Sequence, residues 1–553
     1  MGISQPPKSA IFAERSMCLS ASGEFFIATT YTYPKHKAGK LPPNSLEGDL
    51  MTTLHLSDGI IKDEILVVGL SHKKLTRDGK VNLVIESGDI ALDAKKLLPI
   101  LADMGATGKS DEVIKVPGIT TRLLVFTGLG EHKLSPDDEV LRRASGAAAR
   151  ALCGNSSATF SLPAKKTSSL EAIAEGVLLG SYVFNKFRVD SISQRNPSLK
   201  SVTIHSKQAA SAGSKDAIKR AVIIGQYSSL TRDLINTPPS HLNPDSFCKE
   251  FTNIVKKVGG ASVGLKISIM NESQLKAKGY GGITAVGQGS ANPPRLLHIS
   301  YRPVKAKAKK TYAYVGKGIT FDSGGLALKP AAGMEAMKSD MSGAAAVCSA
   351  TIAIAMMKLP VAIDCYAPLA ENMVSDNATR PSDIITMYGG KTIEVLNPDA
   401  EGRLVLGDAL VKAQENKSLD GIVDVATLTG AQVVALGTRT AAIMTNNQEF
   451  SDHFFEISKT AGEAFWPMPL PVELRASLDS PVADMANIGE RMGGMLVAGL
   501  FLKEFISPEL PWLHLDIAGP AYNEGEPYGY TPVGGTGMAL RSLVALAQSA
   551  AIS

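Results

Sequence analysis

Short apolar runs alternate with longer helix-like stretches along most of the chain. The apolar runs end at turns rich in glycine or proline, which is typical of strands buried within a sheet. In the first half such strands are expected over 64–70 and 121–127, and helices over 139–152 and 169–187. Further strands are expected over 266–269, 295–301, 311–315, 361–366, 421–425 and 512–516. This alternation predicts an α/β fold with mixed, mainly parallel sheets flanked by helices.

Composition shifts divide the chain into four segments. Residues 1–50 have little periodicity beyond one strand-like run over 25–33, and we expect a disordered extension there, with Met51 as a possible true start. Residues 51–200 are expected to form an N-terminal α/β domain, 201–236 a linker and interdomain helix, and 237–553 a larger C-terminal catalytic domain. The helix should stop before Thr237-Pro238-Pro239, because the residue before a proline disfavours helical geometry.

Charge and cysteine content narrow the class of protein. A chain of 553 residues with 44% hydrophobic side chains buries a core unaided, so a disulfide-stapled miniprotein and a disordered chain are excluded. The five cysteines lack CxxC spacing, which predicts reduced thiols, a cytoplasmic location and no thiolate zinc site. A net charge of +4 with dispersed basic residues speaks against a nucleic-acid partner. The uncharged stretch Met341–Met357 is short for a bilayer, so a buried helix and no membrane partner are expected.

Candidate chemistry begins in the window 315–325, VGKGITFDSGG. Lys317 and Asp322 are its only charges, and they lie just beyond a strand of buried type. An isolated buried charge is costly, so such groups are normally paired or bound to metal. A structural Lys–Asp ion pair and a metal site both remain open for this window.

A second cluster lies in the window 397–404, NPDAEGRL. Pro398 favours an extended chain, in which Asp399 and Glu401 would point to the same side and require cations for neutralisation. Arg403 supplies one such charge, and a helix should begin at about residue 404. The alternative is that the acidic residues cap the helix N-terminus.

Two further polar residues have structural roles as alternatives. Asp340 precedes an Ala-rich helix and could serve as its N-cap, and Lys329 could be an ordinary loop lysine. Together the four carboxylates favour hard or borderline divalent ions, and a two-metal site is the natural interpretation. Histidine pairs with ligand spacing, Walker A loops and GxGxxG turns are absent from the sequence. From the residues alone, the prediction is a binuclear metal hydrolase.

The same strings closely resemble the signature of the cytosol (leucyl) aminopeptidase family. The resemblance is carried by VGKGITFDSGG (315–325), MKSDMSGAA (337–345), NPDAEGRL (397–404), ATLTGA (426–431) and WLHLDIAG (512–519). The resemblance is strong over residues 230–545. Over residues 55–200 only the layout of strands and helices is similar, and it implies a macro-domain-like N-terminal domain. Pro398 stands where the family usually has threonine, while the carboxylates around it are retained.

The resemblance implies a role for each polar residue. One divalent ion, manganese or zinc, would be held by Asp322, Asp399 and Glu401, and a second by Lys317, Asp322, Asp340 and Glu401. A water between the two ions would attack the N-terminal peptide carbonyl. Lys329 would stabilise the developing oxyanion, and Arg403 would hold a bicarbonate that shuttles the proton.

The resemblance also implies specificity and assembly. Met337, Thr427 and Gly430 would line a pocket for leucine or another apolar first residue, and six subunits would form a homohexamer acting on short peptides. A leucyl aminopeptidase is therefore the leading hypothesis. The alternatives are a DNA-binding architectural role, in addition to or instead of peptidase activity, a catalytically inactive scaffold and another metal hydrolase.

Overall fold

The computed structural model describes residues 13–19, 25–31, 52–59, 63–73, 81–118 and 121–552. The chain divides into two units, Met1–Gly48 and Asp49–Ser553. In the first unit β1 (Ala13–Leu19) and β2 (Phe25–Tyr31) pair antiparallel, and β2 covers most of the strand-like run seen in the sequence. The rest of the segment expected to be a disordered extension lies outside the described residues.

The N-terminal part of the second unit is built on a seven-stranded sheet in the order β3-β9-β8-β4-β7-β6, with β5 paired to β4. Its central strands are parallel, and β5 and β6 join antiparallel. The strands are β3 (Thr53–Ser57), β4 (Ile65–Lys73), β5 (Asn82–Glu86), β6 (Val113–Pro117), β7 (Leu123–Glu131), β8 (Ser157–Ser161) and β9 (Ser201–His205). The helices are α1 (Ala94–Asp103), α2 (Asp138–Ala151), α3 (Thr167–Gly180) and the short η1 (Asp190–Gln194).

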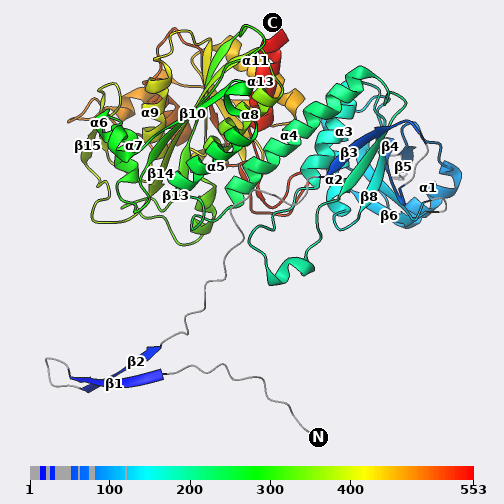
Figure 1. Ribbon diagram of the computed structural model, residues 1–553, viewed down its shortest axis with the longest axis horizontal. Helices are drawn as coiled ribbons and strands as arrows, with labels where there is room; N and C mark the ends of the chain where they lie inside the picture. The colour runs from blue at the N-terminus through cyan, green and yellow to red at the C-terminus, as the bar shows by residue number, and fades with distance from the viewer. Residues whose placement is uncertain are drawn as a thin grey trace. The chain divides into compact units, whose positions relative to one another are not determined.

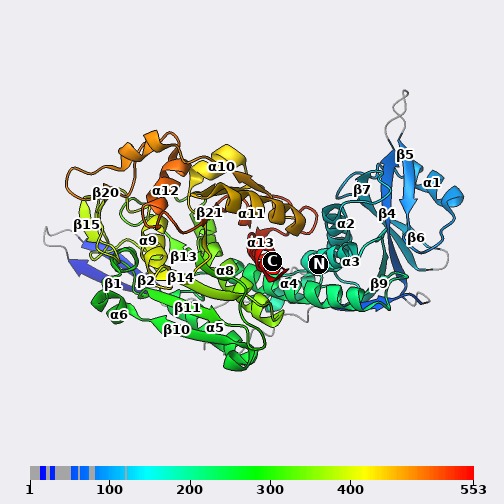
Figure 2. The same ribbon diagram turned by 90° about the horizontal axis from the view of Figure 1, so that it is seen from above.

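Helices cover both faces of this sheet (Figure 2). Ile65 and Val67 of β4 face a core shared with α2 and α3, whereas Leu66 and Val68 face the side where α1 supplies Leu101. Both faces of β4 are therefore buried, which explains its continuous apolar sequence.

The segment 201–236, expected to be a linker and helix, contributes to both parts. Residues 201–205 form β9 inside the N-terminal sheet, where Val202 and Ile204 are buried. Helix α4 (Ala212–Asn236) follows, capped at its start by the Ser211 side chain, and packs against α3 and α8 (Figure 1). It ends before Pro238, as the sequence predicted.

The C-terminal part is built on a nine-stranded mixed sheet in the order β10-β11-β14-β12-β17-β21-β18-β19, with β13 paired to β14. The central strands β14, β12, β17 and β21 are parallel. The strands are β10 (Leu265–Met270), β11 (Arg295–Tyr301), β12 (Thr311–Gly316), β13 (Gly318–Asp322), β14 (Ala362–Asn372), β17 (Gly421–Ala426), β18 (Ala441–Thr445), β19 (Phe465–Pro467) and β21 (Trp512–Asp516). All six strands expected in this half are present, so the mixed, mainly parallel α/β prediction is confirmed.

Two helical layers enclose this sheet, and the small strands form two separate sheets, β15-β16-β20 and β22-β23. One face packs against α4, α5, α8, α11 and α13, and the other against α7, α9 and α12. The helices are α5 (Pro244–Lys257), η2 (Gly260–Val263), α6 (Glu272–Ala277), α7 (Gly281–Gly287), η3 (Met334–Ser339), α8 (Ser342–Met356), α9 (Gly402–Ala413), α10 (Gly430–Leu436), α11 (Gln448–Ala461), η4 (Val472–Leu478), α12 (Gly494–Lys503) and α13 (Leu540–Ile552). The small strands are β15 (Asp383–Thr386), β16 (Thr392–Val395), β20 (Met485–Ala486), β22 (Tyr522–Asn523) and β23 (Gly534–Gly535).

Helix α8 is the apolar core helix of this domain. The helical segment Met334–Met356 is long and apolar enough to cross a membrane, but 94% of its most apolar window is buried inside the protein. Its Ala and Ser side chains let β12 approach closely, and a Cβ on Gly316 would lie 2.5 Å from the carbonyl oxygen of Gly343. The helix therefore holds the end of β12 tightly, directly beside Lys317.

Candidate metal centre

The candidate polar residues come from four separate segments around the carboxyl ends of the central strands. Lys317 lies between β12 and β13, and Asp322 ends β13. Asp340 follows η3, and Glu401 immediately precedes α9. In an α/β sheet this edge is where ligand sites form, because the strand-to-helix loops gather there.

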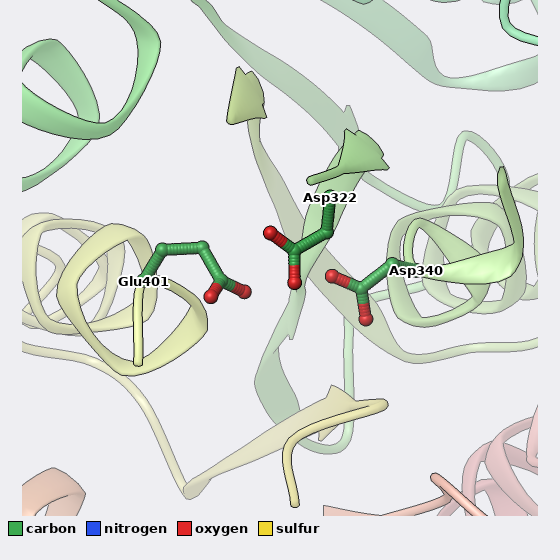
Figure 3. A group of neighbouring side chains, drawn as sticks. All are labelled: Asp322, Asp340 and Glu401. Carbon is green, nitrogen blue, oxygen red and sulfur yellow. The ribbon is translucent and has the colours of Figure 1, made fainter. Parts of the chain in front are cut away.

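Three carboxylates form the centre of the cluster. Asp322, Asp340 and Glu401 are buried, and each offers an oxygen within 4.8 Å of the others'. Figure 3 shows the three carboxylate groups pointing toward a common space. Carboxylates this close repel one another unless protons or cations neutralise them.

Lys317 provides part of this neutralisation. Its Nζ lies 2.9 Å from Asp340 Oδ2 and 2.9 Å from Glu401 Oε1, and donates to the Thr427 carbonyl oxygen at 2.8 Å. Burial acts to lower the pKa of Lys317, but the carboxylates of Asp340, Glu401 and Asp322 outweigh it and raise the pKa. Lys317 is therefore a fully paired ammonium in this structure.

A glycine makes room for this lysine. A Cβ on Gly402 would lie 2.6 Å from Lys317 Cε and 2.8 Å from its Nζ. A side chain at the first residue of α9 would therefore displace the end of Lys317 from its contacts with the carboxylates.

Lys329 neutralises the other side of the cluster. Its Nζ lies 2.8 Å from Asp322 Oδ2 and also contacts Asp399 Oδ1. Asp399 thus joins the cluster through Lys329, although it is more exposed than the three central carboxylates. Each lysine ammonium bridges two carboxylates, as a bound cation would.

The crowding changes the proton affinity of the acids. Burial raises the pKa of Glu401 to about 8, with the charge of Asp322 adding to the effect and Lys317 opposing it. Burial also raises the pKa of Asp340 to about 6, and Lys317 again opposes the shift. Burial and the neighbouring Asp322 raise the pKa of Asp399 as well. The cluster holds more negative charge than its two lysines fully compensate.

Two sequence-based expectations about local structure are wrong. Residues 398–399 form a turn and Glu401 has helical geometry with φ −77° and ψ −34°, so Asp399 and Glu401 do not share one side of an extended chain. Asp340 does not cap α8, because a 3-10 turn precedes it and Met341 occupies the cap position. Its Oδ1 accepts a hydrogen bond from the Thr427 hydroxyl at 2.7 Å instead.

Arg403 lies on the first turn of α9, beneath the cluster. Its Nη1 donates to the carbonyl oxygen of Asn487 at 2.8 Å, and its guanidinium packs over the Phe501 ring. Its Nε is buried and has no hydrogen-bond partner within the described part of the chain. Burial lowers the pKa of Arg403 to about 10, so the group stays charged at neutral pH.

The three residues expected to line a substrate pocket lie on the loops and helix starts around the cluster. Met337 is half-buried in η3, and Thr427 is tied to the cluster through both its carbonyl and its hydroxyl. Gly430 begins α10, and a Cβ placed on it would meet no atom within 4 Å. Open space therefore lies beside position 430.

Two asparagines support the cluster and were not found from the sequence. Asn372 Nδ2 donates to Asp322 Oδ1 at 2.9 Å and to the Pro398 carbonyl at 3.2 Å. Asn487 Oδ1 accepts from the amides of Leu396 and Asn397, which fixes the loop that carries Asp399. The only sequence signal for Asn372 is its place at the end of a long apolar strand.

The donor set fits divalent metal ions. Glu401 Oε2 is buried without a hydrogen-bond partner in the described residues, and it belongs to a cluster of oxygen donors with excess negative charge. Oxygen-rich sets of this kind suit Mg²⁺, Mn²⁺ and related ions.

Comparison with known proteins agrees with this chemistry. Residues 229–544 match the catalytic domain of the cytosol aminopeptidase family, and residues 67–191 match its N-terminal domain. The chain belongs to this family. It is a metallo-aminopeptidase, an enzyme that hydrolyses the N-terminal peptide bond with the help of metal ions.

The similarity to relatives of this aminopeptidase spans almost their full length. A probable cytosol aminopeptidase of Streptomyces griseus subsp. griseus is 47% identical over 524 residues, covering 91% of this chain and 99% of the relative. One from Streptomyces coelicolor is 46% identical over 523 residues, with 91% and 99% covered. Both similarities extend across the two domains.

Solved structures show the same two-domain arrangement. The bottromycin maturation enzyme BotP in complex with Mn has a TM-score of 0.76 and 34% identity, covering 88% of this chain and 99% of BotP. A point mutant of tomato leucine aminopeptidase has a TM-score of 0.78 and 29% identity, covering 91% of this chain and 97% of the tomato chain. The predicted family and fold are thereby confirmed.

Proposed function

We propose that the chain is a leucyl aminopeptidase that removes leucine or another apolar first residue from short peptides. The observation that supports it most is the cluster itself, in which Asp322, Asp340 and Glu401 converge with Lys317 between them. The proposal goes beyond the family's general activity in assigning residues, cofactors and preference.

Two divalent ions would be held by the residues singled out from the sequence. One ligand set is Asp322, Asp399 and Glu401, and the other is Lys317, Asp322, Asp340 and Glu401. The ions would supply Lewis acidity and an acidified water. We propose manganese or zinc, and the Mn bound in the similar BotP structure supports manganese.

Lys329 would bind the substrate's carbonyl oxygen. Its present partners are the carboxylates of Asp322 and Asp399, both of which belong to the proposed ligand set. Once those carboxylates are neutralised by other cations, the ammonium is released to hydrogen-bond with oxygen developing negative charge. Lys329 would then act as the oxyanion stabiliser.

Arg403 would hold a bicarbonate that moves the proton. Its buried, unpartnered Nε and its retained charge suit a small oxyanion at this position. The described site offers no uncommitted histidine or carboxylate as general base, since its carboxylates are paired with lysines or assigned to metal. The bicarbonate would take that role.

The substrate's first side chain would lie against Met337, Thr427 and Gly430. The open space beside Gly430 and the flexible thioether of Met337 suit an apolar side chain of leucine size. A free α-amine bound at the metal centre would restrict cleavage to the N-terminal residue.

We further propose a cytoplasmic homohexamer. Val434, Val472 and Met492 are large apolar side chains at least 78% exposed. They lie on α10, on η4 and just before α12, and α12 packs against both other elements. An exposed apolar group of this kind is typical of a subunit interface. Observations on the described residues do not favour the DNA-binding alternative.

The test measures leucyl-anilide hydrolysis and bound metal together. Asp322→Ala and Glu401→Ala should abolish turnover and lower metal content, measured by mass spectrometry of the dialysed protein. Asp452→Ala, which removes an exposed carboxylate on α11, is the control and should change neither. Turnover that persists in both cluster variants would overturn the assignment, whereas turnover confined to other amino-acyl anilides would overturn only the leucine preference.

A further inference from the structure

A large cavity lies away from the metal cluster. It has a volume of about 570 Å³ and is formed where α2 of the N-terminal part meets the C-terminal part, so none of the proposed catalytic residues lines it. Ligand sites are typically 300–1,000 Å³ and occur often between domains. It is lined from segments 139–143, 439–440, 455–466 and 520–541.

Cations outnumber acids in the wall of this cavity. Arg143, Arg439, Lys459 and Arg541 line it, against only Glu139 and Glu463 among the carboxylates. Arg143 and Lys459 pair with Asp111 and Glu456, which lie outside the wall, so the excess charge rests mainly on Arg439 and Arg541.

Both carboxylates are already occupied. Glu139 pairs with Arg142 and accepts a hydrogen bond from the Tyr530 hydroxyl at 2.8 Å. Glu463 Oε2 accepts from the amide and hydroxyl of Ser542 at 2.9 and 2.6 Å. Glu463 Oε1 also lies 3.7 Å from Arg541 Nε, so Arg541 is partly balanced from inside the wall.

Two of the arginines have nitrogen atoms without partners. Arg541 is 7% exposed, and its Nη1 is buried with no hydrogen-bond partner in the described residues. The same is true of Arg143 Nε, although Arg143 also forms an ion pair with Asp111. A buried unpaired donor costs free energy that an anionic ligand would recover.

The third arginine is held open toward solvent. The Arg439 guanidinium lies 3.8 Å from the centre of the Tyr528 ring, and in the described part of the chain it has no carboxylate within ion-pair distance. Stacking on the ring fixes the guanidinium plane without using its hydrogen-bond donors. Those donors stay available to a ligand at the cavity.

Aromatic surface completes the wall. Phe455 and Trp466 meet edge to face with ring centres 6.1 Å apart, and both line the cavity with Phe465. Trp466 is 55% exposed, which is unusual for so large an apolar side chain. A planar ring in the ligand would cover this surface.

We propose that this cavity is a second binding site, for a small organic anion that carries an aromatic ring. The anionic group pairs with Arg439 and Arg541, and the ring packs against Trp466 and its aromatic neighbours. A carboxylate and a phosphate monoester share this chemistry, and the proposal is independent of the peptidase assignment.

Calorimetry on the metal-loaded protein tests the charge requirement with matched probes. Indole-3-acetate is compared with indole-3-acetamide, and adenosine monophosphate with adenosine, so that each pair differs in the anion alone. In at least one pair the anion should bind at least tenfold more tightly than its neutral partner, and the better pair identifies carboxylate or phosphate. Equal binding within both pairs, or no binding by any probe, would overturn the proposal.

Variants locate the site. Arg439→Gln should weaken binding of the preferred anion at least tenfold. Trp466→Leu should also weaken its binding, because the ring contact is lost. The control Arg195→Gln, which changes an exposed arginine elsewhere, should leave anion binding unchanged. Leucyl-anilide hydrolysis should persist in Arg439→Gln. In the wild-type protein the anion should either inhibit this hydrolysis non-competitively or have no effect on it. Competition with the substrate, or unchanged binding in both cavity variants, would place the anion elsewhere and refute the site.

A changed molecular mass of Arg439→Gln by light scattering would instead make this face a subunit contact and overturn the proposal.

Discussion

Asn372 offers the sharpest test of how the metal centre is held, because its side chain touches the cluster without belonging to the proposed ligands. Its Nδ2 donates to Asp322 Oδ1 at 2.9 Å, and the side chain is buried. Asn372→Ala removes this donor and leaves Asp322 held only by the Gly324 amide and by Lys329. We expect the variant to fold and to bind metal more weakly.

The size of the effect follows from the hydrogen bond. A bond to a charged group contributes about 1.5–3 kcal/mol, and each 1.4 kcal/mol is tenfold, so Mn²⁺ affinity should fall about ten- to hundredfold. Residues that orient metal ligands in other proteins show losses of similar size. Isothermal titration of Mn²⁺ into chelator-treated protein measures the affinity, and leucyl-anilide turnover against Mn²⁺ concentration gives a second readout.

A matched control is available in the same sheet. Asn416 Nδ2 donates to Asp364 Oδ2 at 2.8 Å, and Asp364 is also buried, but this pair lies outside the cluster. Asn416→Ala should leave Mn²⁺ affinity unchanged. If Asn372→Ala binds Mn²⁺ as tightly as wild type, or if both variants lose affinity equally, the orienting role of Asn372 is refuted.

Three further outcomes are expected. Lys317→Met leaves Asp340 and Glu401 without their shared ammonium. Urea unfolding of the chelator-treated variant should therefore give a free energy of unfolding about 3–5 kcal/mol lower than that of wild type. An unchanged unfolding midpoint would contradict the pairing. Gly430→Leu fills the open space at the start of α10, so kcat/KM for leucyl-anilide should fall at least tenfold relative to alanyl-anilide, and an unchanged ratio would remove Gly430 from the pocket. Burial raises the pKa of Asp408 to about 7 from 3.8 despite its backbone N–H donors, so the unfolded state binds fewer protons between these values and stability should fall by about 3 kcal/mol as pH rises from 4 to 7. Thermal melts across this range should show a flatter slope for Asp408→Asn, and parallel slopes would contradict the shift.

The strands and helices that the sequence predicted were recognisable because each of them is buried evenly along its own length. Strands over 295–301 and 512–516 have the bounds expected, since both faces are buried and turns rich in glycine or proline bracket them. Strand β9 was missed because only Val202 and Ile204 mark it within a polar stretch, and its pairing partners lie some 45 and 150 residues earlier. Such a short alternating run becomes a strand only when neighbouring strands accept it, as β3 and β8 do here on its two sides.

The candidate site residues were found through local strings, and the structure brings them together, but their surroundings could not be found that way. Asn372 is the cross-strand partner of Asp322 in the β13–β14 register, and that register is a tertiary fact. The turn at residues 398–399 is closed by Asn397, which accepts from the Asp399 amide, and Asn487 anchors the start of the same loop from 90 residues away. Local patterns identified reactive residues, whereas the groups that orient them depend on long-range pairing.

The charge balance of the cluster explains how so many carboxylates fold together before any metal binds. Lys317 bridges Asp340 and Glu401, and Lys329 bridges Asp322 and Asp399, so each buried acid has a cation beside it. The chain's own lysines therefore neutralise the carboxylates, whereas small metal domains depend on their ion for folding. In the proposed two-metal site the same pairing opposes metal uptake, because Lys317 would have to give up its proton to become a ligand and Lys329 would have to leave its carboxylates. Metal affinity should for that reason rise with pH, and the two lysines set both the stability of the carboxylate cluster and the ease with which it takes up metal.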